Sequence, residues 1–126
     1  MIEILPAPDH VAAVRMEGRL TADDYDKLIA LIEAKLADHP IIHVYADTIP
    51  FDDIAPEALA KDFAYSFSKI TQWPRFRRAA VVTDKGWMRM LLRATAPFVP
   101  TLESRAFGPG EQAEALTWIS AAPDKA

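Results

Sequence analysis

Residues 78–98 have the sequence RAAVVTDKGWMRMLLRATAPF, in which a short apolar run leads directly into a segment of helical character. The run at positions 79–82 has the length and the continuous apolarity of a central strand in a parallel sheet. Thr83 or Asp84 can cap the helix that follows, and the Asp84 carboxylate also suits the positive end of the helix dipole. This stretch therefore predicts a strand followed at once by a helix, the repeating unit of an α/β fold.

The helix expected over residues 85–96 is apolar around most of its circumference. Its apolar side chains are Trp87, Met88, Met90, Leu91, Leu92 and Ala94, with Phe98 shortly after. A helix resting on a sheet needs only one apolar stripe about 100° wide, so the remaining apolar groups must face a second helix, a ligand, a partner chain or lipid. Lys85, Arg89 and Arg93 recur at every fourth position and so form a single basic ridge along the same helix.

The rest of the chain continues the alternation of strands and helices. Apolar runs predict strands over residues 2–5, 11–16, 41–46 and 101–107, and helical periodicity predicts helices over residues 22–39, 57–72 and 111–119. Residues 48–55 are predicted to form a loop, and Thr21 with Asp24 predicts a capping box at the first helix. The first two strands are too close in sequence for a parallel crossover and should form a hairpin. We therefore predict one α/β domain over residues 1–126: a mainly parallel five-stranded sheet, an antiparallel N-terminal edge strand and four helices.

The composition is that of a soluble globular protein. Charged residues make up 25% of the chain, and the absence of cysteine excludes disulfides, thiolate metal ligands and a cysteine nucleophile. No segment approaches the ~20 apolar residues needed to span a membrane, so we expect a cytoplasmic protein. The net charge of −4 is unevenly distributed, because residues 63–107 hold eight basic residues but only two acidic ones. This basic segment indicates either an anionic partner, such as a lipid headgroup, or ion pairs with the acidic helices.

No arrangement of residues points to catalysis. His10, His39 and His43 are scattered, and none has the helical spacing of a zinc site, so we interpret His43 as a structural residue within a strand. Asp47 stands at the C-terminal end of a predicted parallel strand, where α/β sheets bind ligands, although its carboxylate can equally cap the following loop. We therefore expect no enzymatic activity, no cofactor and no metal.

Nucleic acid is also not expected as a partner. The chain has neither of the glycine-rich phosphate-binding motifs, and the one Gly-Pro-Gly sequence, at residues 108–110, is a turn before a helix. It lacks the aromatic platform on strands that RNA readers use, and its isoelectric point near 5.3 is low for a dedicated nucleic-acid binder.

Four short motifs in this order resemble the STAS-type domain, specifically its SpoIIAA-like branch, which is named after a bacterial anti-sigma-factor antagonist. They are GRLTADDY at residues 18–25, VYAD at 44–47, the strand and helix start at 78–87, and the ending AF at 106–107 with EALTWI at 114–119. The resemblance spans nearly the whole chain. It implies a compact β/α fold with four helices, found in small bacterial proteins that are candidates for membrane association and for binding an apolar ligand between mobile helices.

One motif departs from the anti-sigma-factor antagonists. Those proteins are switched by phosphorylation of a Ser or Thr at the start of the helix after the third strand. The corresponding stretch here is DTIPFDD, residues 47–53, in which Thr48 follows the aspartate directly and no glycine is near. Asp52 and Asp53 would repel an added phosphate. Together with Asp47 they could also bind Mg²⁺ through carboxylate oxygens, but we favour the interpretation that they form a solvated acidic turn. The sequence therefore disfavours a phosphorylation switch at Thr48.

These observations lead us to expect a binding module in which the helices over residues 57–72 and 85–96 form a movable wall over an apolar pocket. The expected ligand contacts are Phe63, Phe67, Trp87, Met88, Leu91 and Asp47, and the expected contacts with an anionic headgroup or membrane are Arg78, Lys85, Arg89 and Arg93. The expected partners are an apolar small molecule or lipid, an anionic membrane surface at the inner face, and a second copy of the chain. Two alternatives stay open. The apolar stripe of the helix over residues 57–72, formed by Leu59, Phe63, Phe67 and Ile70, belongs to the core, or the protein is a protein–protein regulatory module of the anti-sigma-factor-antagonist type.

Overall fold

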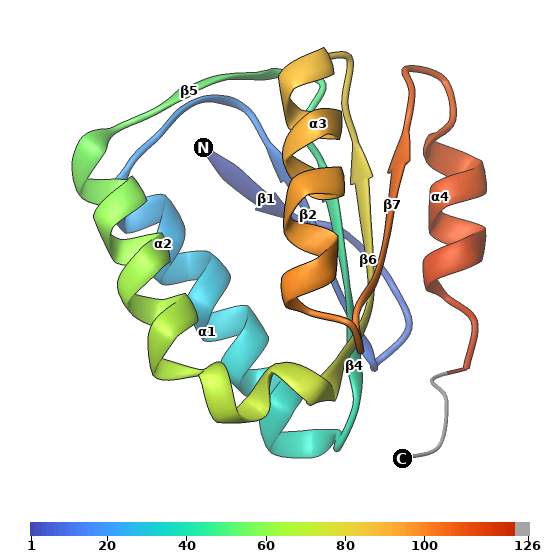
Figure 1. Ribbon diagram of the computed structural model, residues 1–126. Coiled ribbons are helices and arrows are strands. Elements are labelled where there is room, and N and C mark those ends of the chain that lie inside the picture. Colours follow the sequence, from blue (N-terminus) through green and yellow to red (C-terminus); the bar gives the residue numbers. More distant parts are fainter. Residues whose placement is uncertain (123–126) are drawn as a thin grey trace.

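The computed structural model of the protein describes residues 1–122, apart from the side chains of Phe63 and Ile70, and contains a five-stranded sheet (Figure 1). The strand order across the sheet is β1-β2-β4-β6-β7. Strand β1 (Ile2–Ile4) is antiparallel to its neighbour, and the other four strands are parallel to one another. These four are β2 (Val11–Met16), β4 (Ile42–Asp47), β6 (Phe76–Val82) and β7 (Glu103–Phe107). The predicted sheet is therefore confirmed, including its antiparallel N-terminal strand.

Four α-helices cover the two faces of the sheet, as predicted. They are α1 (Ala22–Asp38), α2 (Pro56–Ser68), α3 (Gly86–Thr95) and α4 (Gln112–Ile119). Helix α4 lies alone on one face, where Ile119 packs with Tyr45 and Val82 in one cluster of the core. Helices α1, α2 and α3 lie on the other face, and α2 packs against α1 (Figure 1). The opposite faces therefore bury different side chains of the same strands, because successive strand residues point to opposite sides.

The capping box predicted at the start of α1 is present. The Thr21 hydroxyl accepts a hydrogen bond from the Asp24 backbone N–H at 3.3 Å, and the Asp24 carboxylate accepts one from the Thr21 N–H at 2.8 Å. The N-terminal ammonium lies 3.2 Å from the same carboxylate. Burial acts to raise the pKa of Asp24, but the Thr21 hydrogen bonds and the ammonium outweigh it, so this pKa is lowered. The box therefore fixes the first turn of α1 and ties the N-terminus to it.

A second, two-stranded sheet lies beside the main one and was not predicted. Strand β3 (Gly18–Leu20) pairs in parallel with β5 (Phe51–Ile54). The prediction of a loop over residues 48–55 was therefore wrong for residues 51–54. Gly18 has a φ of 61°, a left-handed conformation that favours glycine, and it turns the chain out of β2. The Gly18 N–H donates to the Pro50 carbonyl at 2.8 Å. Such pairing between distant short segments leaves little periodicity in either one.

Helix α2 ends before the predicted Gln72. The chain continues as a 3₁₀ helix, η1 (Ile70–Arg75), in which the Trp73 indole N–H donates to the Ser66 carbonyl at 3.0 Å. Arg75 donates to three backbone carbonyls at the C-terminal end of α1 and just after it, at 2.6–2.9 Å. These bonds fasten η1 to α1 and place the Trp73 ring near the sheet.

Candidate functional site

A cavity of about 370 Å³ lies on the face of the sheet that carries α1 and α2. This volume falls within the range of ligand pockets, roughly 300–1,000 Å³. Helix α1 forms one wall with Tyr25, Leu28, Ile29 and Ile32, which recur at helical spacing along one side. The same side of α1 continues into the core through its buried residues, so the wall is fixed to the sheet.

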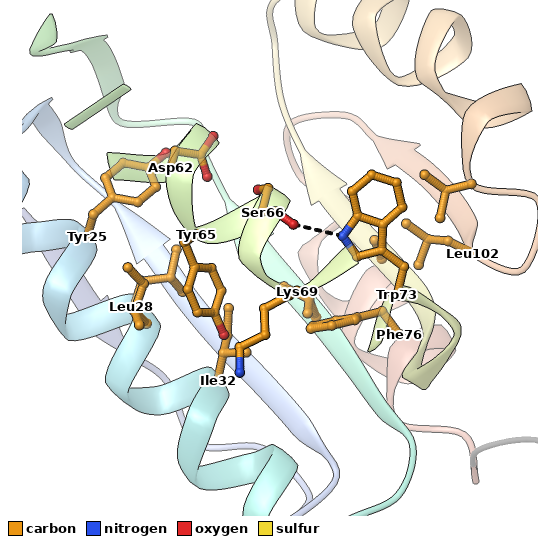
Figure 2. A pocket seen from close by; sticks show the side chains of 14 residues that line it. Tyr25, Leu28, Ile32, Asp62, Tyr65, Ser66, Lys69, Trp73, Phe76 and Leu102 are labelled. Carbon is orange, nitrogen blue, oxygen red and sulfur yellow. Dashed lines mark hydrogen bonds between the residues drawn. The ribbon is translucent and has the colours of Figure 1, made fainter. Parts of the chain in front are cut away.

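The rest of the apolar lining comes from the sheet, from η1 and from the segment after α3. Val44 of β4 and Ala79 of β6 lie beneath the cavity as register partners on adjacent strands. The remaining apolar residues are Phe76, Trp73, Val99 and Leu102. Figure 2 shows the Trp73 ring beside Leu102 at one end, held by the hydrogen bond to Ser66. The cavity is therefore an apolar space bounded by five different elements.

The polar lining comes mainly from α2. It consists of Asp62, Tyr65, Ser66 and Lys69. The Lys69 ammonium forms an ion pair with Glu33 of α1 at 2.7 Å and lies 5.8 Å from the centre of the Tyr65 ring. Burial, together with the nearby Glu33 carboxylate, raises the pKa of Tyr65 to about 12. The positive charge of Lys69 is thus already neutralised within the wall.

Asp62 and Tyr25 form one end of the cavity. Figure 2 shows their side chains close together, Asp62 from α2 and Tyr25 from α1. Burial raises the pKa of Asp62 above its ordinary value of 3.8. Burial also raises the pKa of Tyr25, and the neighbouring Asp62 adds to that shift. This end of the cavity therefore carries a carboxyl group that is poorly solvated.

The predicted ligand contacts lie elsewhere. Phe67, Trp87 and Leu91 are 65%, 57% and 53% exposed and do not line the cavity. Met88 is half-buried and packs on the core, and its sulfur lies 3.4 Å from the Thr48 hydroxyl oxygen. The side chain of Phe63 lies outside the described part of the structure. The structure does not bring the described four together around a pocket, so their role as ligand contacts stays a prediction.

Sequence reasoning missed most of the residues that do line the cavity. Trp73, which Pro74 follows, was not among the predicted ligand contacts. Leu28, Ile29 and Ile32 were expected to belong to the apolar face of the first helix, and no ligand contact was predicted for them. A usable signal was present in α1, where adjacent apolar residues at positions 28–29 and 31–32 make a face wider than one contact surface requires.

Asp47 is a structural residue at the end of β4. Its side chain is buried and accepts a hydrogen bond from the Ile49 N–H at 3.1 Å, while the Arg15 guanidinium lies 3.8 Å away. This is the capping arrangement that the sequence left open, and Asp47 does not line the cavity. His43 is also buried, and its Nδ1 lies within hydrogen-bond distance of the Ile119 carbonyl, at 2.8 Å.

Helix α3 contains no buried residue. We name as the α3 apolar surface three exposed residues of this helix, Trp87, Met90 and Leu91, together with Phe98 in the 3₁₀ turn just after it; these side chains are 53–78% exposed. Neither Thr83 nor Asp84 caps the helix through a side-chain bond to its first turn, although the Thr83 hydroxyl accepts a hydrogen bond from the Lys85 N–H at 3.0 Å. Because so little of α3 is buried, its apolar surface is open to a further partner.

The basic ridge of α3 is only partly as predicted. Arg89 and Arg93 line a second cavity of about 260 Å³ against β7, and within residues 1–122 neither forms an ion pair. Lys85 lies 3.3 Å from the Asp84 carboxylate. Arg78 lies apart from these three residues. Its guanidinium donates to the Trp118 carbonyl at 2.9 Å and stacks on the Trp118 indole ring, on the side of the sheet that carries α4. Strand alternation explains this, since Arg78 shares its face with the α4-packed side of β6.

No α-helix in the described part of the chain is both long enough and apolar enough to cross a membrane. No three His, Asp or Glu side chains of residues 1–122 converge in a way that could hold a metal ion.

Comparisons with known proteins agree on the fold. A family model described as SpoIIAA-like matches residues 11–120. A crystal structure of an uncharacterised DUF3478-family protein with a SpoIIAA-like fold, from Shewanella loihica PV-4, is similar with a TM-score of 0.70 and 25% identity, covering 94% of this chain and 92% of that one. The anti-sigma factor antagonist SpoIIAA in its unphosphorylated form has a TM-score of 0.60 and 8% identity, covering 97% and 100%. No curated protein sequence matches the chain.

Proposed function

The chain belongs to the SpoIIAA-like family, and from this premise we propose that it is a non-enzymatic binding module that holds an apolar ligand and associates with an anionic membrane surface. The observation that carries the proposal is the 370 Å³ cavity between α1, α2 and the sheet, whose lining is mostly aliphatic and aromatic. An apolar ligand placed there removes its own surface and that of the wall from water, which is worth roughly 25 cal/mol per Å² of apolar area. The occupant is an apolar small molecule or a lipid-like molecule.

Peripheral membrane contact is the role proposed for α3. The α3 apolar surface would enter the boundary between headgroups and acyl chains, and Arg89 and Arg93 would meet anionic headgroups. Each basic residue near an anionic bilayer contributes about 1 kcal/mol. The protein would then lie at the inner face of the cytoplasmic membrane without spanning it.

Ligand binding is tested with N-phenyl-1-naphthylamine, a neutral dye that fluoresces in apolar surroundings. Titration of the purified protein should give saturable fluorescence at about one dye per chain, and Leu102→Asp, which puts a charge into the lining, should abolish it. Leu59→Asp is the matched control, because Leu59 is an exposed leucine outside the cavity lining. Absence of saturable fluorescence with the wild-type protein would refute the binding proposal.

Membrane association is tested by co-sedimentation with vesicles of phosphatidylcholine alone or mixed with phosphatidylglycerol. Binding should require the anionic lipid, and the double change Arg89→Gln with Arg93→Gln should weaken it by roughly 30-fold, since two charges at about 1 kcal/mol each are lost. Leu91→Ser should also weaken it, whereas Leu59→Ser, on α2, should not. Equal binding to both kinds of vesicle, or none to either, would contradict the membrane role.

The second candidate is a protein–protein regulatory module of the anti-sigma-factor-antagonist type, and the shared fold favours it. The state of Thr48 opposes regulation by phosphorylation at that position. Its side chain is 3% exposed, and its hydroxyl donates to the Val82 carbonyl at 2.7 Å, so a kinase could reach it only after local opening. A pull-down with the wild-type protein that recovers a kinase-like partner would favour this candidate over the first.

A further inference from the structure

The cavity is electrostatically asymmetric, and the asymmetry concerns Asp62. This carboxyl group lies at one end of the lining, beside Tyr25, and the opposite end is the apolar pair Trp73 and Leu102 (Figure 2). Within residues 1–122, no hydrogen bond or ion pair holds the Asp62 carboxylate. Its pKa is raised because burial costs the charged form solvation that no neighbour replaces.

The basic groups of α2 and η1 on this side of the sheet are already engaged. Lys61, the residue before Asp62, forms an ion pair with Asp26 of α1 at 2.6 Å. Lys69, the residue directly after α2, is paired with Glu33 at 2.7 Å. Arg75 of η1 spends its donors on backbone carbonyls and on a glutamine side chain. Among the lining residues that the structure describes, an incoming polar group therefore meets the Asp62 carboxyl without an ion-pair partner, and the basic residue there, Lys69, is already paired.

We propose that Asp62 is the specificity-determining residue of this cavity, and that it selects apolar ligands with a hydrogen-bond-donating head, an alkylammonium or an alcohol, over fatty acids. The head lies against Asp62 and Tyr25, and the tail lies along the α1 wall toward Trp73. This inference rests on the proposed function, because it names the ligand class of the same cavity. It also separates the two surfaces: the cavity prefers donors and cations, while the α3 ridge prefers anions.

The physical basis is the cost of an unpartnered carboxyl in an apolar wall. An ammonium or hydroxyl head gives the Asp62 carboxylate the donor that it lacks, and hydrogen bonds to charged groups contribute more than neutral ones. A carboxylate head meets the negative charge of Asp62 at close range, where the local dielectric constant is lower than in water. One of the two acids must then be protonated, which weakens binding at neutral pH.

Competition between ligands that share one tail tests the inference. N-phenyl-1-naphthylamine is bound to the protein and displaced at pH 7 by decylamine, decan-1-ol or decanoate. Decylamine should displace the dye at a concentration at least tenfold below that of decanoate, with decan-1-ol between them. Asp62→Asn removes the charge and keeps the shape of the side chain. In this variant, the concentrations of decanoate and decylamine that displace the dye should differ by no more than about twofold. Asp38→Asn is the matched control, because Asp38 is exposed at the end of α1 and does not line the cavity.

Each outcome decides between distinct conclusions. Dye binding with equal displacement by decylamine and decanoate would overturn the assignment of Asp62 and leave the proposed function standing. A tenfold preference that persists in Asp62→Asn would overturn it in the same way, because another group would then select the head. Failure of the dye to bind the wild-type protein would overturn the proposed function, and this inference with it.

Discussion

A larger side chain on the floor of the cavity should both stabilise the protein and weaken ligand binding. Ala79 lies on β6 beneath the cavity, and Ala79→Leu adds three carbon atoms that point into it. At about 30 Å³ per heavy atom, the share that a water molecule takes in the liquid, they need about 90 Å³. The cavity offers about 370 Å³, so the larger side chain fits without displacing the walls.

The stability gain follows from the area that these atoms remove from water. Three buried carbon groups at about 0.8 kcal/mol each give an upper limit of about 2.4 kcal/mol. Because the cavity is open on one side, we expect a gain of about 1–2 kcal/mol in the free energy of unfolding, measured by urea denaturation. The affinity for N-phenyl-1-naphthylamine should fall at least tenfold in the same variant.

Ala106→Leu provides the matched control for Ala79→Leu. Ala106 lies on the neighbouring strand β7 and lines the second cavity, against α3, so this variant should keep the dye affinity of the wild type. If Ala79→Leu instead lowered the free energy of unfolding by about 1–3 kcal/mol, the usual cost of overpacking, the space above Ala79 would not be a cavity. Unchanged dye affinity in Ala79→Leu would place the binding site elsewhere on the protein.

Three further predictions concern single residues. Asp62→Asn should raise the free energy of unfolding at pH 7, because a raised pKa means that the charged carboxylate destabilises the folded state there. This gain in stability over the wild type should shrink as the pH falls through the raised pKa and vanish below the ordinary pKa of 3.8. A gain that grew toward low pH would contradict the prediction. Thr48→Val should lower the free energy of unfolding by only about 1 kcal/mol, because the Val82 carbonyl still accepts a hydrogen bond from the backbone N–H of residue 48. Thr48→Glu should lower it several-fold more, because it buries a charge. Equal decreases in urea denaturation would mean that the site is not buried. Thr21→Ala should lower the free energy of unfolding by about 1 kcal/mol, because it removes the capping box. An unchanged free energy of unfolding in urea denaturation would mean that the cap does not contribute to stability.

Local signals accounted for most of the fold. The apolar run over residues 79–82 became the C-terminal part of β6, and the capping box at Thr21 formed as its spacing predicts. Pairing of β3 with β5 escaped detection, because each strand is short and its partner lies far along the chain. The early end of α2 also escaped detection, since it depends on a hydrogen bond from Trp73 back to the Ser66 carbonyl.

The candidate site was harder to predict than the fold. The abundance of apolar residues on α3 correctly indicated a surface with more apolar area than the sheet can cover, and the structure leaves Trp87 and Leu91 exposed. A cavity, however, depends on how far apart the backbones of α1 and α2 lie, and no pattern within one helix encodes that distance. Asp62 illustrates the point, because its importance comes from Tyr25 on another helix and not from its neighbours in sequence.

The most direct test of the account is a methyl NMR titration of the isotope-labelled protein with N-phenyl-1-naphthylamine. The account predicts that chemical-shift changes and contacts with the dye concentrate on methyl groups of the cavity lining, namely Leu28, Ile32, Val44 and Leu102. Leu59 and Leu91, on the outer sides of α2 and α3, should change little. Shifts that concentrate on Leu59 and Leu91, with the lining unaffected, would contradict the account and move the binding site to the exposed surfaces of the two helices.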